Sequence, residues 1–215
     1  MIGRFPFYIN TNLSFDKFKK EPELKLLLIK TLLNIPFKGV GEFVSELPAL
    51  YFRIVGPFKG RNTIGFSVIT KSHKIFQLTW LALNSLKGKN VTFNGDSVVV
   101  KGVFVSKNRK DVFLLNDLSE FKIAPTGNII FNTPTILNDF NFLGKKDGFH
   151  IFAESLKIKK VQTAFGSAIT GKIEYMINGN LTKASDYLLE KFFSGVGENT
   201  KLGFGDILIK PFSNE

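Results

Sequence analysis

Two histidines are present in this sequence, and their settings differ. His73 lies between Lys71 and Lys74 at the entry of a predicted helix. Neighbouring cations favour the neutral form of an imidazole, and the neutral form can accept a proton as a general base. An exposed histidine at a helix start without any chemical role is the alternative interpretation. His150 lies beside Phe149 and is interpreted as a structural or surface residue.

Four glycines fall within residues 195–205 (GVGENTKLGFG), namely Gly195, Gly197, Gly203 and Gly205. This stretch follows a predicted helix, whereas the phosphate loops of nucleotide enzymes follow a strand and open a helix. ATP and NAD are therefore disfavoured as ligands. Glycines can lie flat against a nucleic-acid backbone and offer N–H donors, with Lys201 as the adjacent cation. A tight turn needed only for packing is the alternative.

The positive charge of the chain is concentrated in its first half. The 215 residues include 29 Lys and Arg against 18 Asp and Glu, a formal net charge of +11. Residues 1–110 hold 18 basic and 6 acidic residues, whereas residues 111–215 hold 11 and 12. A one-sided positive field suits a polyanion such as nucleic acid or an anionic membrane surface. A solvated lysine face is the alternative.

The composition excludes several classes of protein. With 44% hydrophobic residues the chain can build a core, and without cysteine it has no disulfide, no cysteine-ligated metal site and no thiol nucleophile. Two histidines also disfavour an all-histidine metal site, so we expect neither metal nor cofactor. No apolar run approaches the roughly 18–20 residues of a membrane span, and the first residues do not form a signal peptide. We therefore expect a soluble cytoplasmic protein.

Hydrophobic periodicity predicts the order β-α-β-β-α-β in the first half, which is the ferredoxin-like (RRM-like) pattern. The expected elements are a strand at Arg4–Asn10, a helix at Ser14–Leu33 interrupted at Pro22, strands at Pro48–Gly56 and Thr63–Thr70, a helix at His73–Leu86, and strands at Val91–Phe93 and Ser97–Ser106. The turn at 57–62 would place the cations Lys59 and Arg61 at the tip of a hairpin.

The second half repeats this order less regularly. The expected elements are a strand at Asn128–Leu137, a helix at Phe149–Lys160, a long strand or hairpin at Thr163–Ile177 pivoting near Gly171, a helix at Thr182–Phe193 capped by Thr182 and ended by Gly195, and a strand at Phe204–Lys210. The sequence therefore predicts an α+β protein of two tandem ferredoxin-like modules, residues 1–118 and 119–215, joined near Asn116–Glu120. This fold hosts many activities and gives no function by itself.

The segment Ala168–Ile207 (AITGKIEYMINGNLTKASDYLLEKFFSGVGENTKLGFGDI) resembles the C-terminal signature of the CRISPR-associated endoribonucleases that cut precursor CRISPR RNA within its repeats. These enzymes belong to the RAMP superfamily, whose ferredoxin-like modules carry a glycine-rich loop before the final strand. Phe121–Leu137 also resembles the strand with Thr-Pro-Thr that opens their second module. The first half matches by element order and by a loose similarity of Thr63–Val105.

The resemblance implies cleavage without metal or cofactor, in which a ribose 2′-hydroxyl attacks the neighbouring phosphate and leaves a cyclic phosphate. It implies CRISPR repeat RNA as partner, other Cas proteins of an effector complex as further partners, and a monomer or homodimer. Such chemistry needs a base, an acid and a cation. Many members place a histidine near the end of the first helix, whereas residues 25–47 here contain no His and no Tyr.

The candidate catalytic residues are therefore His73, Lys30 and Lys38, the two lysines because they lie where the family keeps its active site. The candidate RNA-binding residues are Lys59, Arg61, Gly195, Gly197, Lys201, Gly203 and Gly205. A non-catalytic RAMP subunit that holds guide RNA is the alternative function. A housekeeping RNA-binding protein is a third, disfavoured because no aromatic RNA-stacking motif lies on a suitable strand. Tyr8 and Tyr51 lie on predicted strands, where RNA bases stack in related folds.

Overall fold

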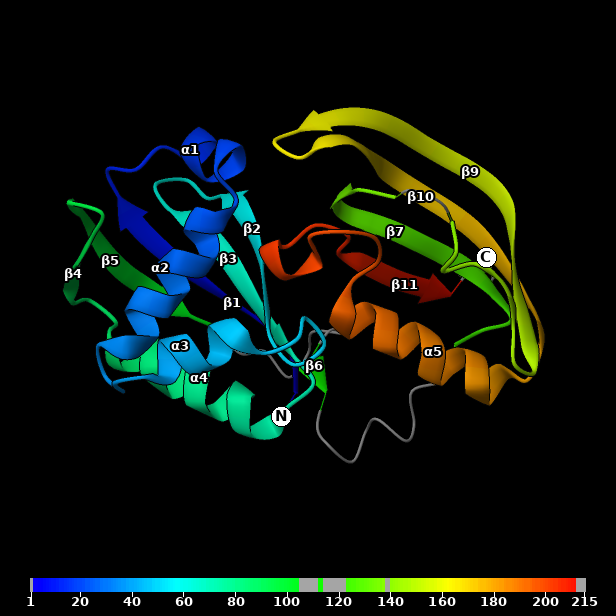
Figure 1. The fold of residues 1–215 in the computed structure, drawn as a ribbon, viewed down its shortest axis with the longest axis horizontal. Helices are drawn as coiled ribbons and strands as arrows, with labels where there is room; N and C mark the ends of the chain where they lie inside the picture. The colour runs from blue at the N-terminus through cyan, green and yellow to red at the C-terminus, as the bar shows by residue number, and fades with distance from the viewer. Residues whose placement is uncertain (1, 105–111, 114–122, 138–139, 212–215) are drawn as a thin grey trace. The chain divides into compact units, whose positions relative to one another are not determined.

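The computed structural model describes residues 2–104, 112–113, 123–137 and 140–211, and the chain divides into two compact units. The N-terminal unit comprises residues 1–116 and the C-terminal unit residues 117–215. Each unit is built on one antiparallel sheet with helices packed on one face (Figure 1). The predicted junction at 116–120 lies outside the described residues. The predicted α+β class is confirmed.

The N-terminal unit has the elements of a complete ferredoxin-like module. In chain order they are β1 (Ile2–Thr11), α1 (Phe15–Lys20), α2 (Glu23–Asn34), α3 (Val40–Glu46), β2 (Arg53–Lys59), β3 (Ile64–Thr70), α4 (His73–Ser85), β4 (Asn90–Phe93), β5 (Asp96–Val103) and β6 (Val112–Phe113). The strand order is β2-β3-β1-β5-β4, and β6 pairs with the start of β1. Strands β1 and β3 are central, as the predicted element order requires.

Alternation along β1 builds the core of this unit. Phe5, Phe7 and Ile9 are fully buried in one cluster with Leu28 of α2 and Phe76 of α4. The rings of Phe5 and Phe76 meet edge to face with centroids 4.9 Å apart. Each buried side chain of this size contributes roughly 1.5–3 kcal/mol. The helices therefore cover one face of the sheet, and the intervening residues of β1 face the other way.

The first helical segment is divided at Pro22, as predicted. Ser14 caps α1 by accepting a hydrogen bond of 3.1 Å from the Lys17 amide. Proline has no N–H to continue the helical hydrogen bonds, so α1 ends before Pro22 and α2 begins after it. Helix α3 was not predicted, because its seven residues include Gly41 and bury only that glycine and Val44.

The hairpin of β2 and β3 is shifted from its predicted position. A turn occupies the first part of the predicted strand 48–56, and β2 begins after it. A hydrogen bond of 2.9 Å from the Gly60 amide to the Thr63 carbonyl closes the connection between the two strands. Lys59 therefore ends a strand and Arg61 lies in the turn, and both side chains are exposed.

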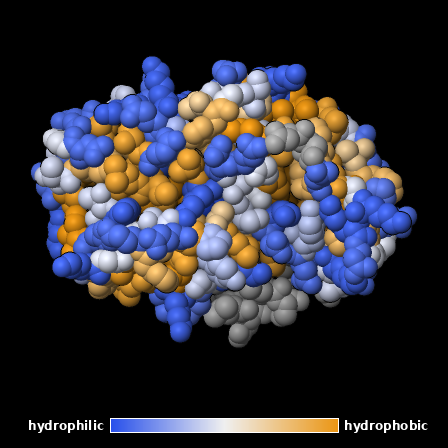
Figure 2. All heavy atoms as spheres, in the orientation of Figure 1, coloured by the Kyte–Doolittle hydropathy of each residue, from blue (hydrophilic) through white to orange (hydrophobic). Residues whose placement is uncertain are grey.

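The helical face of the N-terminal unit is mixed in character. Leu27 on α2, Phe43 on α3 and Leu81 on α4 are 43%, 52% and 51% exposed. Figure 2 shows hydrophobic patches between hydrophilic side chains over this part of the molecule. The net positive charge of the first half is therefore not spread as a uniform basic surface over these helices.

The C-terminal unit contains a second, shorter version of the same module. Its elements are β7 (Thr126–Thr135), β8 (Gly144–Lys146), β9 (Phe149–Thr163), β10 (Gly166–Gly179), α5 (Leu181–Ser194), the 3₁₀ helix η2 (Thr200–Leu202) and β11 (Ile207–Pro211). The strand order is β11-β7-β10-β9-β8. Helix α5 packs Ala184 and Leu188 against Ile173 and Tyr175 of β10. Between β7 and β9, the described residues contain β8 where the module would have its first helix.

The helix predicted at Phe149–Lys160 is wrong, because this segment forms most of strand β9. Phe149, Phe152 and Leu156 have helical spacing, but Phe152 and Leu156 are 36% and 52% exposed. The buried residues are Phe149 and Ile151, which follow the period of a strand. Strand β9 pairs with β10 along its whole length. This long-range pairing outweighs the local spacing.

The predicted pivot near Gly171 is also corrected. The chain reverses at Ala164 and Phe165, between β9 and β10. Gly171 instead marks a shift of register between β10 and β7. It adopts φ +119°, and a Cβ atom there would collide with the carbonyl oxygen of Lys157 on β9. The glycine therefore allows close approach of two strands and does not form a turn.

The N-cap of helix α5 lies two residues before the predicted one, and the helix ends at Gly195 as predicted. Asn180, not Thr182, is the N-cap, and its side chain accepts a hydrogen bond of 3.0 Å from the Lys183 amide. Gly195 ends the helix with φ 79°, a left-handed value that glycine adopts without a steric penalty. In the described part of the chain, no helix is long and apolar enough to cross a membrane.

Candidate nucleic-acid interface

The glycine-rich loop folds back onto its own unit. Three of its amides donate to backbone carbonyls of the opposite arm or of the segment at the end of β7: Val196 N to Gly205 O (2.9 Å), Glu198 N to Ile136 O (3.0 Å) and Gly205 N to Pro134 O (3.0 Å). The last two bonds attach the loop to the end of β7 and the residue after it. The two arms of the loop are thus hydrogen-bonded to each other and to the segment at the end of β7.

All four loop glycines have positive φ, between 64° and 83°. A Cβ atom on Gly197 would collide with the Ile136 carbonyl, and one on Gly205 with the Val196 carbonyl. These two glycines therefore have a packing role inside the unit. Lys201, in η2, is partly buried. Contact between the loop and nucleic acid remains a prediction.

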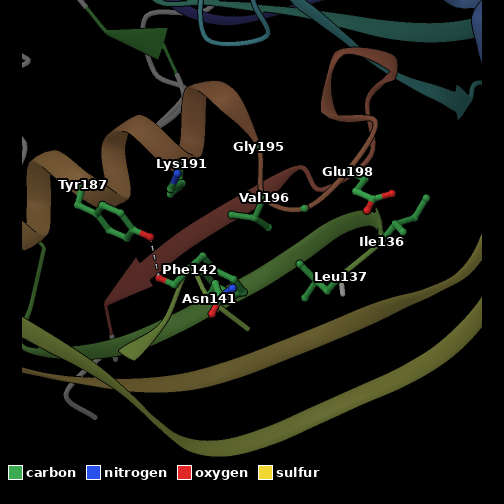
Figure 3. A pocket seen from close by; sticks show the side chains of 10 residues that line it. Ile136, Leu137, Asn141, Phe142, Tyr187, Lys191, Gly195, Val196 and Glu198 are labelled. Carbon is green, nitrogen blue, oxygen red and sulfur yellow. Dashed lines mark hydrogen bonds between the residues drawn. The ribbon is translucent and has the colours of Figure 1, made fainter. Parts of the chain in front are cut away.

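A pocket of about 380 Å³ opens beside the first arm of the loop. Figure 3 shows Tyr187 reaching from α5 toward Phe142, with Lys191 on the same helix and Val196 on the loop side. The Tyr187 hydroxyl donates to the Phe142 carbonyl (3.1 Å). This hydrogen bond connects α5 to the segment after β7 and shapes the pocket wall.

Two lysines lie over the ring of Tyr187. The ammonium of Lys191 is 5.2 Å from the ring centroid and that of Lys146 is 5.5 Å from it, distances typical of cation–π contacts. Burial, followed by the charge of Glu190, raises the pKa of Tyr187, so its hydroxyl stays protonated. The pocket therefore offers ammonium and amide donors beside an aromatic ring, and sequence periodicity did not indicate it.

The open face of the C-terminal sheet carries an ionic cluster. Glu174 accepts contacts from Lys157 (3.0 Å) and Lys172 (2.9 Å), and Lys172 also donates to the Asn128 side chain (3.3 Å). Hydrogen bonds from Lys172 and Lys157 lower the pKa of Glu174 to about 2. Lys172 and Glu174 lie on the segment predicted as a strand or hairpin at 163–177, whereas Lys157 lies in 149–160, which was wrongly predicted as a helix.

His73 is the first residue of α4 and is partly buried behind its N-cap, Ser72. An apolar hollow of about 430 Å³ adjoins this helix start. Its walls include Phe43 of α3, Tyr51, and Ser72 and Lys74, which flank His73 in sequence. Tyr51 lies in the turn before β2, not on the predicted strand.

Lys30 and Lys38 occupy different positions around α2. Lys30 lies on α2 itself, and its ammonium is 3.6 Å from the Glu42 carboxylate on α3. Asn34 donates to the same carboxylate (2.8 Å). Backbone and Asn34 hydrogen bonds, with the Lys30 charge, lower the pKa of Glu42. Lys38 lies between α2 and α3 and is exposed.

The predicted residues thus fall into two sets. The N-terminal unit holds His73, Lys30, Lys38, Lys59 and Arg61, and the C-terminal unit holds Gly195, Gly197, Lys201, Gly203 and Gly205. Within the described residues, no group of three or more His, Asp or Glu side chains could hold a metal ion.

No protein-family model matches the sequence, and neither does any curated protein. Among solved structures, a Cas6 product complex superimposes with a TM-score of 0.68 at 15% identity, covering 97% of this chain and 100% of that one. A second Cas6 product complex gives 0.65 at 16% identity, covering 97% and 98%. A RAMP protein binding different RNA substrates gives 0.57 at 12% identity, covering 96% and 99%.

These matches extend over both units and agree with the resemblance carried by Ala168–Ile207. The chain therefore has the tandem ferredoxin-like fold of the Cas6 and RAMP proteins.

Proposed function

We propose that this protein binds CRISPR repeat RNA and cleaves precursor CRISPR RNA within its repeats. The observation that carries the proposal is the match to Cas6 product complexes over nearly the whole chain. The basic N-terminal half adds the charge that an RNA partner requires, because neutralised phosphates release condensed counterions. Other Cas proteins of an effector complex are proposed as further partners.

The proposed reaction requires no metal. The ribose 2′-hydroxyl loses its proton to a base and attacks the adjacent phosphorus, the bond to the 5′-oxygen breaks, and that oxygen takes a proton from an acid. The products are a 2′,3′-cyclic phosphate and a 5′-hydroxyl. His73 is the proposed base, and Lys30 or Lys38 is proposed to stabilise the charge that develops on the phosphate.

The second candidate is a RAMP subunit that holds guide RNA without cutting it. The observation that favours it is the absence of His and Tyr from residues 25–47. It would share the fold, the glycine-rich loop and the basic half. The two functions differ in a single property, which is cleavage.

Incubation of labelled cognate repeat RNA with the protein in EDTA distinguishes them. Endonuclease activity should give one cut with a cyclic phosphate, and a 2′-deoxy substitution at the cut position should abolish it. Binding of the RNA without cleavage would support the non-catalytic subunit. Failure to bind the repeat at all would contradict both functions.

A further inference from the structure

Tyr8 lies between two glycines on the neighbouring strands of the N-terminal sheet. It pairs with Gly65 of β3 on one side and with Gly102 of β5 on the other. Its sequence neighbours Phe7 and Ile9 belong to the core under the helices. Because strand residues alternate, Tyr8 is on the sheet face that the helices of this unit do not cover.

The two glycines leave space into which aromatic rings fit. A Cβ atom on Gly65 would lie 2.9 Å from Cε1 of Tyr8, and one on Gly102 would lie 2.7 Å from Cε2 of Phe104. Each ring therefore rests directly against a glycine backbone. The Tyr8 and Phe104 rings meet edge to face, with centroids 5.5 Å apart.

Phe58 of β2 completes this group. It pairs with Gly65 from the opposite side, so that it shares the face of Tyr8. Tyr8 and Phe58 are partly buried, and Phe104 is 55% exposed. We call Tyr8, Phe58 and Phe104 the aromatic platform.

The charges around the platform are positive. The ranges of β1, β2 and β3 contain no Asp or Glu, and Lys101 beside Gly102 is exposed. The platform also belongs to the half of the sequence with 18 basic and 6 acidic residues. At such a surface we favour a nucleic acid over an apolar protein as the partner. The phosphates of a nucleic acid interact with the positive charges and its bases stack on the rings, whereas an apolar protein would use the rings alone.

We propose that the aromatic platform stacks unpaired bases of single-stranded RNA. The inference rests on the proposed RNA-binding function and adds a second contact region to it, distinct from the glycine-rich loop. Every base has a flat face, so stacking on a ring tolerates any sequence. In RNA-recognition modules, aromatic side chains on the face of a four-stranded sheet stack RNA bases in this way.

The test measures binding of a fluorescein-labelled, unstructured uridine decamer to the full-length protein. A stacked base is worth about 5- to 150-fold in affinity, so Tyr8→Leu/Phe104→Leu should weaken binding at least fivefold. The loss should be the same at low and high salt, because stacking releases no counterions. Gly65→Ala should also weaken binding by displacing the Tyr8 ring. Phe152→Leu on β9, also an exposed aromatic, should bind like wild type.

Equal decamer affinity of wild type and the double variant would overturn the platform, and so would a wild type that does not bind the decamer. A double variant with unchanged RNA affinity but a changed sedimentation coefficient would identify the face as a protein interface, which also overturns it. Thermal unfolding checks that the variants are folded. Repeat cleavage in EDTA is scored separately. A wild type that binds the decamer but cuts no RNA, with weaker binding in the double variant, leaves the platform standing and rejects the nuclease.

Discussion

The ammonium of Lys25 on α2 donates a hydrogen bond of 2.9 Å to the carbonyl oxygen of Gly56 on β2. Lys25 is 3% exposed, and burial lowers its pKa to about 8 although Glu23 acts in the opposite direction. The bond reaches β2 where its register with β3 shifts, between Val55 and Phe58. Lys25 therefore stabilises an irregular strand from inside the unit and is not one of the surface cations.

We expect the contribution of Lys25 to the free energy of unfolding to rise with pH. Its pKa is about 8 in the folded protein and about 10.5 in the unfolded chain, so the unfolded state binds more protons between these values. Stability therefore increases with pH across that window, by roughly 3 kcal/mol in total. Denaturant unfolding at pH 7 to 10.5, followed by Trp80 fluorescence, should show wild type gaining relative to Lys25→Met. Parallel pH profiles would contradict this assignment.

Gly205→Ala should destabilise the protein more than Gly144→Ala. Both glycines have positive φ, 64° and 87°, so each substitution costs about 1–2 kcal/mol of backbone strain. A Cβ on Gly144 meets nothing within 4 Å, whereas one on Gly205 collides with the Val196 carbonyl. The collision should add about 1–3 kcal/mol. Urea unfolding of the two variants measures the difference, and equal losses would show that the loop relaxes freely.

Lys59→Gln/Arg61→Gln should reduce the salt dependence of RNA binding. Each phosphate contact to a single strand contributes a slope of about −0.7 in log affinity against log salt, so the double variant should flatten the slope by up to about 1.4. Fluorescence anisotropy at several salt concentrations gives the slope. Lys87→Gln/Lys89→Gln, exposed in the turn after α4, is the matched control. An unchanged slope in the first variant would place the RNA away from this hairpin.

His73→Ala should lower repeat cleavage by at least about 10²-fold while RNA affinity stays nearly constant, because general-base catalysis contributes about 10²–10⁴-fold. His150→Ala is the matched control, since the His150 ring packs on Phe152 in the other unit (centroids 3.7 Å). Single-turnover rates in EDTA measure the effect. A loss below about threefold excludes His73 as the base.

Loss of cleavage in Lys30→Ala or Lys38→Ala, with His73→Ala active, would indicate a site that works by positioning and charge. Lys30→Ala also removes the cation 3.6 Å from the Glu42 carboxylate. Lys30→Arg keeps that charge and should retain the helix contact. Cleavage by Lys30→Arg but not by Lys30→Ala would therefore identify the charge as the requirement.

Local patterns in the sequence were sufficient where neighbouring residues decide the structure. The alternation of Phe5, Phe7 and Ile9 specified β1, the absent N–H of Pro22 divided the first helix, and Gly195 ended α5. Asn94 and Gly95 adopt the positive φ values, 50° and 82°, that a two-residue hairpin turn needs. In each case the responsible atoms are within a few residues of one another, so the sequence alone determined where these elements of the first module and helix α5 begin or end.

Only the tertiary structure decided the features that depend on distant pairing. Phe149, Phe152 and Leu156 have the spacing of a helix. The segment nevertheless forms a strand, because its backbone N–H and C=O groups are hydrogen-bonded to β10. Nothing in the sequence distinguished Lys25 from the other lysines, because its hydrogen-bond partner Gly56 lies on β2 and is distant in sequence. The surroundings of Tyr8 likewise depend on Gly65 and Gly102, which are distant in sequence and pair with it on either side. The sequence determined which residues were available, and strand register decided which of them meet, because one-residue changes in pairing move a side chain to the other face of a sheet.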